Sequence, residues 1–310
     1  MPNSTLNSFP LISIITVNYN QAKTTMEMIE SLSNITYPNI EIIVVDNAST
    51  KEDPQIIKET YPRIILIESV LNYGFAGGNN LGIMRARGEY ILLLNNDTIV
   101  DPNFLEPLVK KFQDNPKIGA ISPKIRYFYK KDTFQYAGYT EINKWTIRNK
   151  TIGENEIDTG QYNEDRETAY THGAAMMVPM EVIKKVGMMS YEFFLYYEEA
   201  DWCLRIRKYG YKIMYVHNSL VYHKGSVTTG KNSALKVHYL TRNRLVFMRR
   251  NIHGIEFVFA LLYQIVVAIG KNSIIFILKG KWKLAGAYWS GILWNVKNVF
   301  NKEIHDNPMI

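Results

Sequence analysis

The chain of 310 residues is poor in cysteine and has no segment typical of a secretory signal. Its one cysteine, Cys203, excludes an internal disulfide and agrees with a reducing compartment. Residues 1–10 have neither the basic start nor the apolar run of a signal peptide, so we expect the folded part to be cytoplasmic. Hydrophobic residues make up 46% of the chain, which is enough to bury a sizeable core and excludes a disordered protein.

An excess of positive charge is also absent from most of the chain. Although the formal net charge is +7, residues 1–230 contain 24 Lys and Arg against 26 Asp and Glu. Residues 231–310 contain 12 basic and 3 acidic side chains, interleaved with long apolar runs. This pattern favours an anionic membrane surface over nucleic acid, and no recognisable nucleic-acid motif is present. A basic binding protein without catalysis is the alternative interpretation.

Residues 11–122 alternate apolar runs with amphipathic stretches, as βαβ units do. The apolar runs are LISIITVN, IEIIVVD, RIILIES and EYILLLNND. They are apolar on both faces, as expected for a parallel sheet that helices cover on both sides, and they predict a doubly wound α/β half. Residues 123–230 are less regular, and the polar stretch at 155–166 is a candidate mobile loop or a solvated excursion.

Polar residues stand at the end of every apolar run. They are Asn18, Asp46, Ser69 with Asn72 just beyond, and Asn95 to Asp97. Because ligands of open parallel sheets bind outside the carboxyl ends of the strands, these ends predict a binding crevice, although Asn and Asp are also common in turns.

Two features at this edge suit a phosphate and a metal ion. Gly74, Gly77 and Gly78 could bring backbone N–H groups to a phosphate before a helix, although the Walker lysine and the GxGxxG spacing are absent. Asp97 follows a buried strand, and Mg²⁺ or Mn²⁺ often combines one or two carboxylates with substrate phosphates. A strand-ending Asp is also a common turn or capping residue.

An acidic cluster begins a predicted helix in the segment FFLYYEEADWCLR. Glu198, Glu199 and Asp201 lie within four positions, which the helix dipole explains in part. The five apolar and aromatic residues before them would place a carboxylate in a partly apolar setting, where it becomes a better base. The segment therefore predicts a general base.

Eight short strings occur in the order found in glycosyltransferase family 2. They are VNYN, VVDNAS, NYGFAGGNN, LLNNDT, HGAAMMVP, YEEADWCLR, VYHKGS and YLTRNR. From Leu11 to about Arg250 the chain resembles that family, above all its rhamnosyltransferase-like and galactofuranosyltransferase-like branches. The resemblance implies a GT-A fold, which is an α/β fold with a Rossmann-like mixed sheet, and an inverting mechanism. It also implies a nucleotide-sugar donor held through Mn²⁺ or Mg²⁺.

The resemblance further implies roles for individual residues. The metal ligands would be Asp97, in the DXD position, and His223, while Glu199 would be the base and Asp201 a second catalytic acid; Glu198 stays an alternative base. Trp202 and His172 would contact the acceptor. The nucleotide sugar would be bound by Asn18, Asp46, Asn72, Gly77, Asn80, Asn95, Asn96, Arg242 and Arg244. The regions would be a tail (1–10), a nucleotide-sugar-binding half (11–122), an acceptor-binding and catalytic half (123–230) and a basic helical region (231–310).

The last region predicts helices at a membrane surface. A helix capped by Asn232 or Ser233 would end near Arg250, and the following run IEFVFALLYQIVVAIG has 16 residues. A transmembrane helix needs about 20, and Lys271 and Asn272 interrupt this run, so we expect interfacial helices with Lys and Trp anchors. The expected location is the inner face of the cell membrane, with a polyprenyl-diphosphate-linked glycan as acceptor. A helical subdomain on the core or a homo-oligomer interface is the alternative.

Within enzymes, the rival is a sugar-phosphate nucleotidyltransferase, but its glycine- and lysine-rich loop is missing after Ile15. The donor stays open between UDP- and dTDP-sugars, with a rhamnosyl group as one candidate.

Overall fold

One mixed sheet of ten strands forms the centre of the computed structural model, which describes residues 9–225 and 233–298. The strand order is β3-β2-β1-β4-β9-β6-β10-β5, with β7 beside β6 and β8 beside β10. The strands are β1 (Ile12–Asn18), β2 (Ile40–Asp46), β3 (Ile65–Glu68), β4 (Tyr90–Leu94), β5 (Thr98–Val100), β6 (Ile118–Tyr127), β7 (Lys130–Tyr136), β8 (Arg166–Glu167), β9 (Ala175–Pro179) and β10 (Lys212–His223). Most of the predicted tail, residues 1–8, lies outside the described residues.

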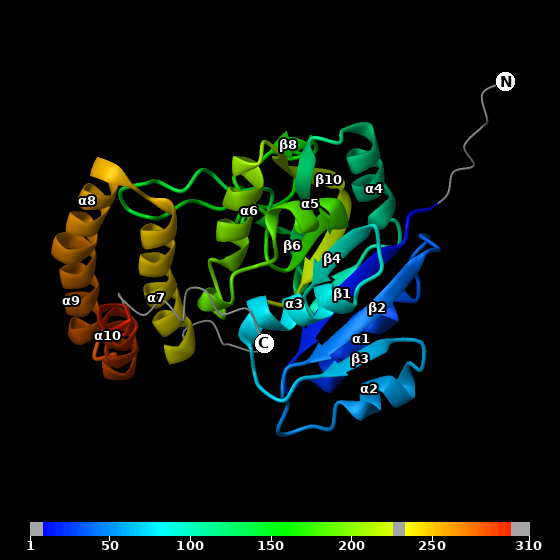
Figure 1. Cartoon of the computed structure of the whole chain (residues 1–310), viewed down its shortest axis with the longest axis horizontal. Helices are drawn as coiled ribbons and strands as arrows, with labels where there is room; N and C mark the ends of the chain where they lie inside the picture. Colours follow the sequence, from blue (N-terminus) through cyan, green and yellow to red (C-terminus); the bar gives the residue numbers. More distant parts are fainter. Residues whose placement is uncertain (1–8, 226–232, 299–310) are drawn as a thin grey trace.

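Helices cover both faces of this sheet (Figure 1). One hydrophobic core lies under α1 (Ala22–Leu32), α2 (Gln55–Thr60) and α4 (Leu105–Asp114), and the other under α3 (Gly74–Arg85), α5 (Met180–Val186) and α6 (Glu198–Lys208). Side chains alternate along a strand, so Ile14 of β1 belongs to the first core and Ile15 to the second, and both are fully buried. Strands β1 to β4 are parallel, which confirms the predicted doubly wound half.

The second half continues the same sheet. Strand β9 runs antiparallel to β4 and β6, whereas β10 runs parallel to β6 and antiparallel to β5. Residues 122 and 123 both lie within β6, so the predicted boundary falls inside a strand and the two halves are not separate units. The sheet is mixed, as the resemblance implies.

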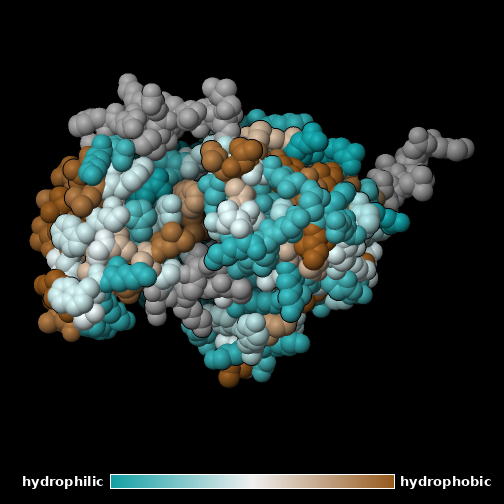
Figure 2. All heavy atoms as spheres, turned by 90° about the horizontal axis from the view of Figure 1, so that it is seen from below, coloured by the Kyte–Doolittle hydropathy of each residue, from teal (hydrophilic) through white to brown (hydrophobic). Residues whose placement is uncertain are grey.

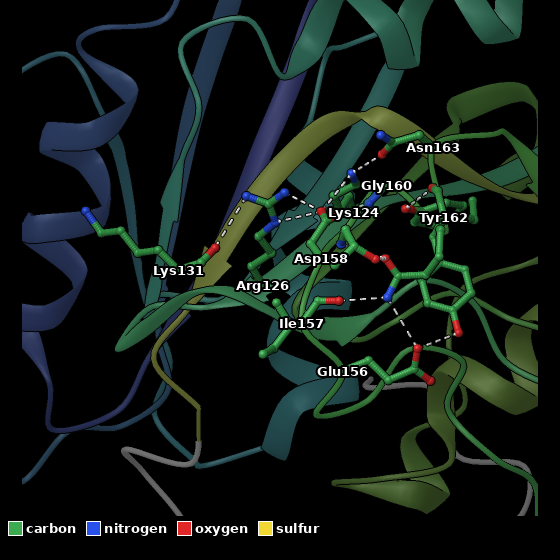
Figure 3. A network of polar contacts seen from close by, with 12 residues as sticks. Lys124, Arg126, Lys131, Glu156, Ile157, Asp158, Gly160, Tyr162 and Asn163 are labelled. Atoms are coloured by element: carbon green, nitrogen blue, oxygen red, sulfur yellow. Dashed lines mark hydrogen bonds and ion pairs between the residues drawn. The ribbon is translucent and has the colours of Figure 1, made fainter.

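The stretch at 155–166 is fixed to the sheet, which does not agree with the prediction of a mobile loop. Figure 3 shows Asp158 between two basic side chains of β6. Nζ of Lys124 lies 3.1 Å from Oδ2 of Asp158 and 2.7 Å from Oδ1 of Asn163, and Arg126 pairs with the same carboxylate. Because the Asp158 side chain is only 4% exposed, these ion pairs anchor the loop from inside.

Within the described residues, three helices follow β10. They are α7 (Ala234–Asn251), a long helix over Gly254–Leu278 that comprises α8 (Gly254–Leu262), the π-helical η2 (Tyr263–Ile269) and α9 (Gly270–Leu278), and α10 (Trp282–Lys297). Oγ of Ser233 accepts a hydrogen bond from the Lys236 N–H, which confirms this cap, whereas Asn232 lies outside the described residues. The prediction that Lys271 and Asn272 interrupt the run is wrong, because the helix continues through them.

The long helix of 25 residues has its bulky apolar side chains on the outside. By length and composition it could cross a membrane, and 11% of its most apolar window is buried. The buried residues of this helix are small or polar, namely Ala260, Gln264 and Ala268, while Phe257 packs half-buried against the second core. The exposed ones include Ile255, Val258, Phe259, Leu262, Ile265, Val266, Ile274 and Leu278. Figure 2 shows the resulting apolar surface at the end of the molecule formed by α8 and α9.

Candidate active site

The polar ends of three strands meet, as the sequence predicts. Asn18 and Asp46 are in register on β1 and β2, and Nδ2 of Asn18 donates to Oδ1 of Asp46 at 2.7 Å. Oγ1 of Thr25 donates to Oδ1 of Asn18, and Nδ2 of Asn96 donates to Oγ1 of Thr25. This chain of hydrogen bonds joins the ends of β1, β2 and β4 at one edge of the sheet.

The residues beyond β2 and β3 form a second part of this edge. Both oxygens of the buried Asp46 carboxylate accept hydrogen bonds from Ser49, through its N–H and its hydroxyl. Oδ1 of Asn72 accepts from Nδ2 of Asn47 and from the Gly74 N–H. Asn72 is exposed, and Asn95 is half-buried beside β4. Nucleotide contacts of Asn18, Asp46, Asn72, Asn95 and Asn96 stay predictions.

Asp97 and His223 form a buried pair at this edge. Oδ1 of Asp97 lies 3.0 Å from Nε2 of His223, and the two residues are 5% and 7% exposed. Strand β10 brings them together, because His223 is paired with Thr98 of β5. Burial acts to raise the pKa of Asp97, but the hydrogen bond and charge of His223, together with a backbone hydrogen bond and the charge of Lys224, hold the pKa below its usual value.

This pair fits a divalent metal ion. Nδ1 of His223 lies 2.8 Å from Oε1 of Gln135, and donation to this oxygen would leave Nε2 as the ligand atom once Nε2 gives up the proton that it shares with Asp97. Adjacent ligands of an octahedral ion with bonds of about 2.1 Å are about 3.0 Å apart, as these two atoms are. Within the described residues no group of three or more His, Cys, Asp or Glu side chains could hold a metal. The remaining ligands would therefore be substrate phosphate and water.

Two glutamates begin α6. Glu198 is 3% exposed, whereas Glu199 is only half-buried. Burial raises the pKa of Glu199 to about 7, and a hydrogen bond from Glu198 limits this rise. Burial and then the charge of Glu199 raise the pKa of Glu198 well above its usual range. Glu198 therefore keeps its proton and donates it in a hydrogen bond to Glu199, which is the member of the pair that ionises near neutral pH.

Aromatic rings connect the metal pair to the glutamates. The ring of His172 lies 5.9 Å from that of His223 and is parallel to the ring of Tyr139 at 6.1 Å. Tyr139 in turn stacks on Tyr170 at 4.1 Å. Burial and then the Glu199 carboxylate raise the pKa of Tyr139, and burial, Tyr139 and then Glu199 raise that of Tyr170, so both rings lie within the field of Glu199. His172, Tyr139 and Tyr170 form an aromatic layer between the two groups.

His172 has one defined tautomer in this layer. Its Nδ1 accepts a hydrogen bond of 3.0 Å from the Ala174 N–H, so its proton is on Nε2. Burial and then His223 lower the pKa of His172 to about 3, which keeps the ring neutral. The half-buried ring can donate one hydrogen bond from Nε2, but the predicted contact with the acceptor stays a prediction.

Asp201 and Trp202, predicted as a second catalytic acid and an acceptor contact, are both buried, and these roles stay predictions. Asp201 is 1% exposed, and both of its oxygens accept hydrogen bonds, from Arg205, Arg250 and Asn251. Trp202 is fully buried, and its Nε1 donates to the Gly187 carbonyl at 2.8 Å. Neither side chain is open to a substrate. They anchor α6 to α7 and to the loop after α5.

Three residues predicted to bind the nucleotide sugar have partners within the protein, and their contacts with the donor stay predictions. Arg242 is 7% exposed, donates from Nη2 to the Glu192 carbonyl at 2.7 Å and lies 3.8 Å above the Trp294 ring. Asn80 is fully buried and exchanges two hydrogen bonds with the Met189 backbone. Gly77 lies inside α3, where a Cβ atom would be 2.5 Å from Cβ of Tyr73. Close packing explains this glycine.

The predicted phosphate loop is also wrong, because helix α3 already begins at Gly74. The N–H groups of Phe75 and Ala76, at its N-terminus, donate to the carbonyl of Phe194. A protein carbonyl therefore occupies the place expected for a phosphate. Arg244 is half-buried and donates from Nε to the Tyr197 hydroxyl, and its phosphate contact stays a prediction.

The sequence did not single out four residues of the candidate site, namely Gln135, Tyr139, Tyr170 and Asn243. Asn243 lies within the string YLTRNR, so a signal for it was present but was assigned to the arginines.

A cavity of about 740 Å³ lies at the opposite edge of the sheet, where β4 and β6 begin, and belongs to none of these groups.

Comparisons with known proteins agree with the predicted family. The family model described as "Glycosyl transferase family 2" matches residues 13–187. The low-salt glycan biosynthesis hexosyltransferase Agl10 of Haloferax volcanii is 28% identical over 204 residues, which cover 64% of this chain and 62% of that protein. The dTDP-rhamnosyl transferase RfbF of Shigella flexneri is 27% identical over 260 residues, 78% of this chain and 83% of the other.

A solved structure has the same fold. The mannosyltransferase PcManGT of Pyrobaculum calidifontis, in complex with GDP-Man and Mn²⁺, superposes with a TM-score of 0.58 over 96% of this chain and 89% of that one, at 17% identity. This likeness confirms the GT-A fold. The chain spans less than two thirds of the length of Agl10, whereas it covers most of RfbF.

Proposed function

This chain belongs to glycosyl transferase family 2 and is a glycosyltransferase, and we propose that it transfers a hexosyl or deoxyhexosyl group with inversion. The donor would be a UDP- or dTDP-sugar, and the acceptor a hydroxyl of a lipid-linked precursor of a cell-surface glycan. Its likeness to RfbF supports a rhamnosyl group as the first candidate.

The observation that carries the proposal is the arrangement of two unlike groups around one aromatic layer. Asp97 and His223 offer a carboxylate oxygen and an imidazole nitrogen 3.0 Å apart, which suits a metal-bound diphosphate. Glu199 offers a partly exposed carboxylate whose pKa of about 7 suits a general base. His172 contacts the rings of His223 and Tyr139, and Tyr139 lies in the field of Glu199, which supports a sugar site beside His172.

In the proposed reaction Glu199 accepts the proton of the acceptor hydroxyl while the oxygen attacks the anomeric carbon. The new bond forms on the face opposite the leaving group, and the bond from that carbon to the diphosphate oxygen breaks with its electron pair. Neutral Glu198 donates its hydrogen bond to Glu199 and so keeps this carboxylate ionised near pH 7. A divalent ion held by Asp97 and His223 would offset negative charge on the leaving diphosphate.

The long C-terminal helix supports a site at the inner membrane face. Its most exposed side chains are bulky and apolar, while its buried residues are small or polar, as expected for a helix surrounded by lipid. Gln264 donates to the Thr146 carbonyl, and Phe259 stacks on Trp145. Both contacts hold the helix against the loop that follows β7. Exposed Lys279, Lys281 and Lys283 beside it suit anionic headgroups.

A panel of nucleotide sugars tests the proposal. UDP- and dTDP-hexoses, including dTDP-rhamnose, would be incubated with the protein and Mn²⁺, with an EDTA arm, and release of UDP or dTDP would be measured. We expect turnover of one donor that EDTA abolishes. Turnover that ignores EDTA would remove the metal from the proposal, and lack of turnover with every donor would contradict the donor class.

A further inference from the structure

The backbone directly before the glutamates has an uncommon conformation. Phe194 has φ 62° and ψ −56°, and the Leu195 N–H donates to the Phe193 carbonyl at 2.6 Å, which makes a γ-turn of the rare strained form. Tyr196 and Tyr197 follow with φ 71° and 75°. Three of the four residues before Glu198 are thus non-glycine residues with positive φ. Such a run persists only where its surroundings hold it.

Asn243 of α7 holds this run from one side. Its side chain is fully buried, and Nδ2 lies 2.7, 2.7 and 2.8 Å from the carbonyl oxygens of Phe193, Leu195 and Tyr196. An amide has two N–H groups, so at least one of them is shared between two carbonyls. Nη1 of Arg242 donates to Oδ1 of Asn243, which fixes the orientation of the amide.

Helix α3 holds the run from the other side. The carbonyl of Phe194 accepts hydrogen bonds from the N–H groups of Phe75 and Ala76. A Cβ atom on Gly74 would lie 2.2 Å from this carbonyl oxygen, and Gly74 itself has φ +69°. Only glycine permits this approach. The strained turn is therefore fixed by two helices that belong to different parts of the chain.

We propose that Asn243 is a positioning residue that sets the direction of the Glu199 carboxylate, and this rests on the proposed role of Glu199 as base. Tyr197 is the N-cap of α6, so the dihedral angles of the run set where the first helical residues point. The rest of α6 has other anchors, since Trp202 donates to Gly187 and Asp201 pairs with Arg250. Loss of the Asn243 hydrogen bonds would consequently move the first turn of α6 while the helix stays folded.

The test compares the isosteric substitution Asn243→Asp with the control Asn295→Asp. Asn295 is 5% exposed, and its Nδ2 also donates to two carbonyls, those of Arg242 and Gly291, but it lies on α10, away from the turn. We expect Asn243→Asp to lower kcat about 10²-fold, the scale of a small misplacement of a reacting group. The KM for the donor and the affinity for Mn²⁺ with UDP or dTDP should stay within about twofold of the values for the unchanged protein. A base contributes to the transition state and not to binding of the donor.

The outcomes separate this inference from the proposed function. The positioning role is overturned if Asn243→Asp and Asn295→Asp have the same kcat. It is also overturned if Asn243→Asp loses kcat and nucleotide affinity to the same extent. Glu199→Gln is measured in parallel; if it keeps transfer activity, the base assignment fails and the positioning role fails with it. Asn243→Ala, which adds no charge, gives the same comparison if Asn243→Asp yields no soluble protein.

Discussion

Nε2 of His223 lies 3.0 Å from Oδ1 of Asp97, and Gln135 on β7 fixes the imidazole from its other side. Residues far apart in the chain are thus joined by hydrogen bonds in one row. The proposed metal site would therefore depend on Gln135, a side chain that would not contact the metal itself.

Gln135→Ala should therefore weaken Mn²⁺ binding. Loss of an outer hydrogen-bond partner typically costs about 10- to 100-fold in metal affinity, because the ligand imidazole is no longer oriented. Titration of Mn²⁺ in the presence of UDP or dTDP measures the effect. Gln113→Ala, at an exposed position on α4, is the control and should bind as the unchanged protein does. Equal affinity of the two variants would contradict the metal site.

The rate of transfer should fall below neutral pH. The pKa of Glu199 is raised to about 7, so this carboxyl gains a proton as the pH falls through that value and can no longer accept one from the acceptor. We expect kcat/KM to drop about tenfold for each pH unit below 7 and to level off above it. A profile that is flat from pH 5 to 8 would exclude Glu199 as the base.

The two glutamates should respond differently to removal of their charge. Glu199→Gln should lower turnover about 10²- to 10⁴-fold and keep nucleotide binding, because it removes the base alone. Glu198→Gln replaces a protonated carboxyl by a neutral amide that can still donate to Glu199, so most activity should remain. Steady-state rates of both variants decide the assignment; an inactive Glu198→Gln beside an active Glu199→Gln would reverse it.

The apolar face of the long helix should bind lipid. We expect the full chain to sediment with vesicles that contain phosphatidylglycerol, and Val266→Glu to reduce this binding more than tenfold, since a charge is costly within lipid. Val266 is 71% exposed on η2, and Val70, 87% exposed beyond β3, provides the matched control Val70→Glu. Equal sedimentation of both variants would show that this face does not contact the bilayer.

The fold and the strand ends could be predicted because their signals are local. Four apolar runs with polar ends predict a parallel sheet with a polar edge, and Asn18, Asp46 and Asn96 do lie there in one network. Parallel strands bring their carboxyl ends together whatever the rest of the chain does. The pairing of Asp97 with His223 could be predicted only from the resemblance. His223 lies opposite Thr98, the residue after Asp97, and 125 positions separate these two strand partners.

The sequence could not predict the burial of polar residues whose partners are distant in sequence. Arg242 bonds the backbone at Glu192 and Phe193, and Asp201 bonds Arg250 and Asn251, each about 50 positions away. From sequence alone such residues on amphipathic helices are interpreted as exposed and available to a substrate. Burial with a complete set of partners is a property of the tertiary structure. The close packing of Gly77 was likewise hidden, because one of its two neighbours, Tyr191, comes from another segment.

Helix α7 has a consequence for attempts to obtain a water-soluble enzyme by deletion. Its Arg242 lies above the Trp294 ring, and the Arg242 carbonyl accepts a hydrogen bond from Asn295, both on α10. A shortened protein ending before Gly254 would expose this side of α7 to solvent, only one helix away from the turn that precedes Glu199. Replacing outward-facing side chains of the long helix one at a time would gain solubility and leave that support intact.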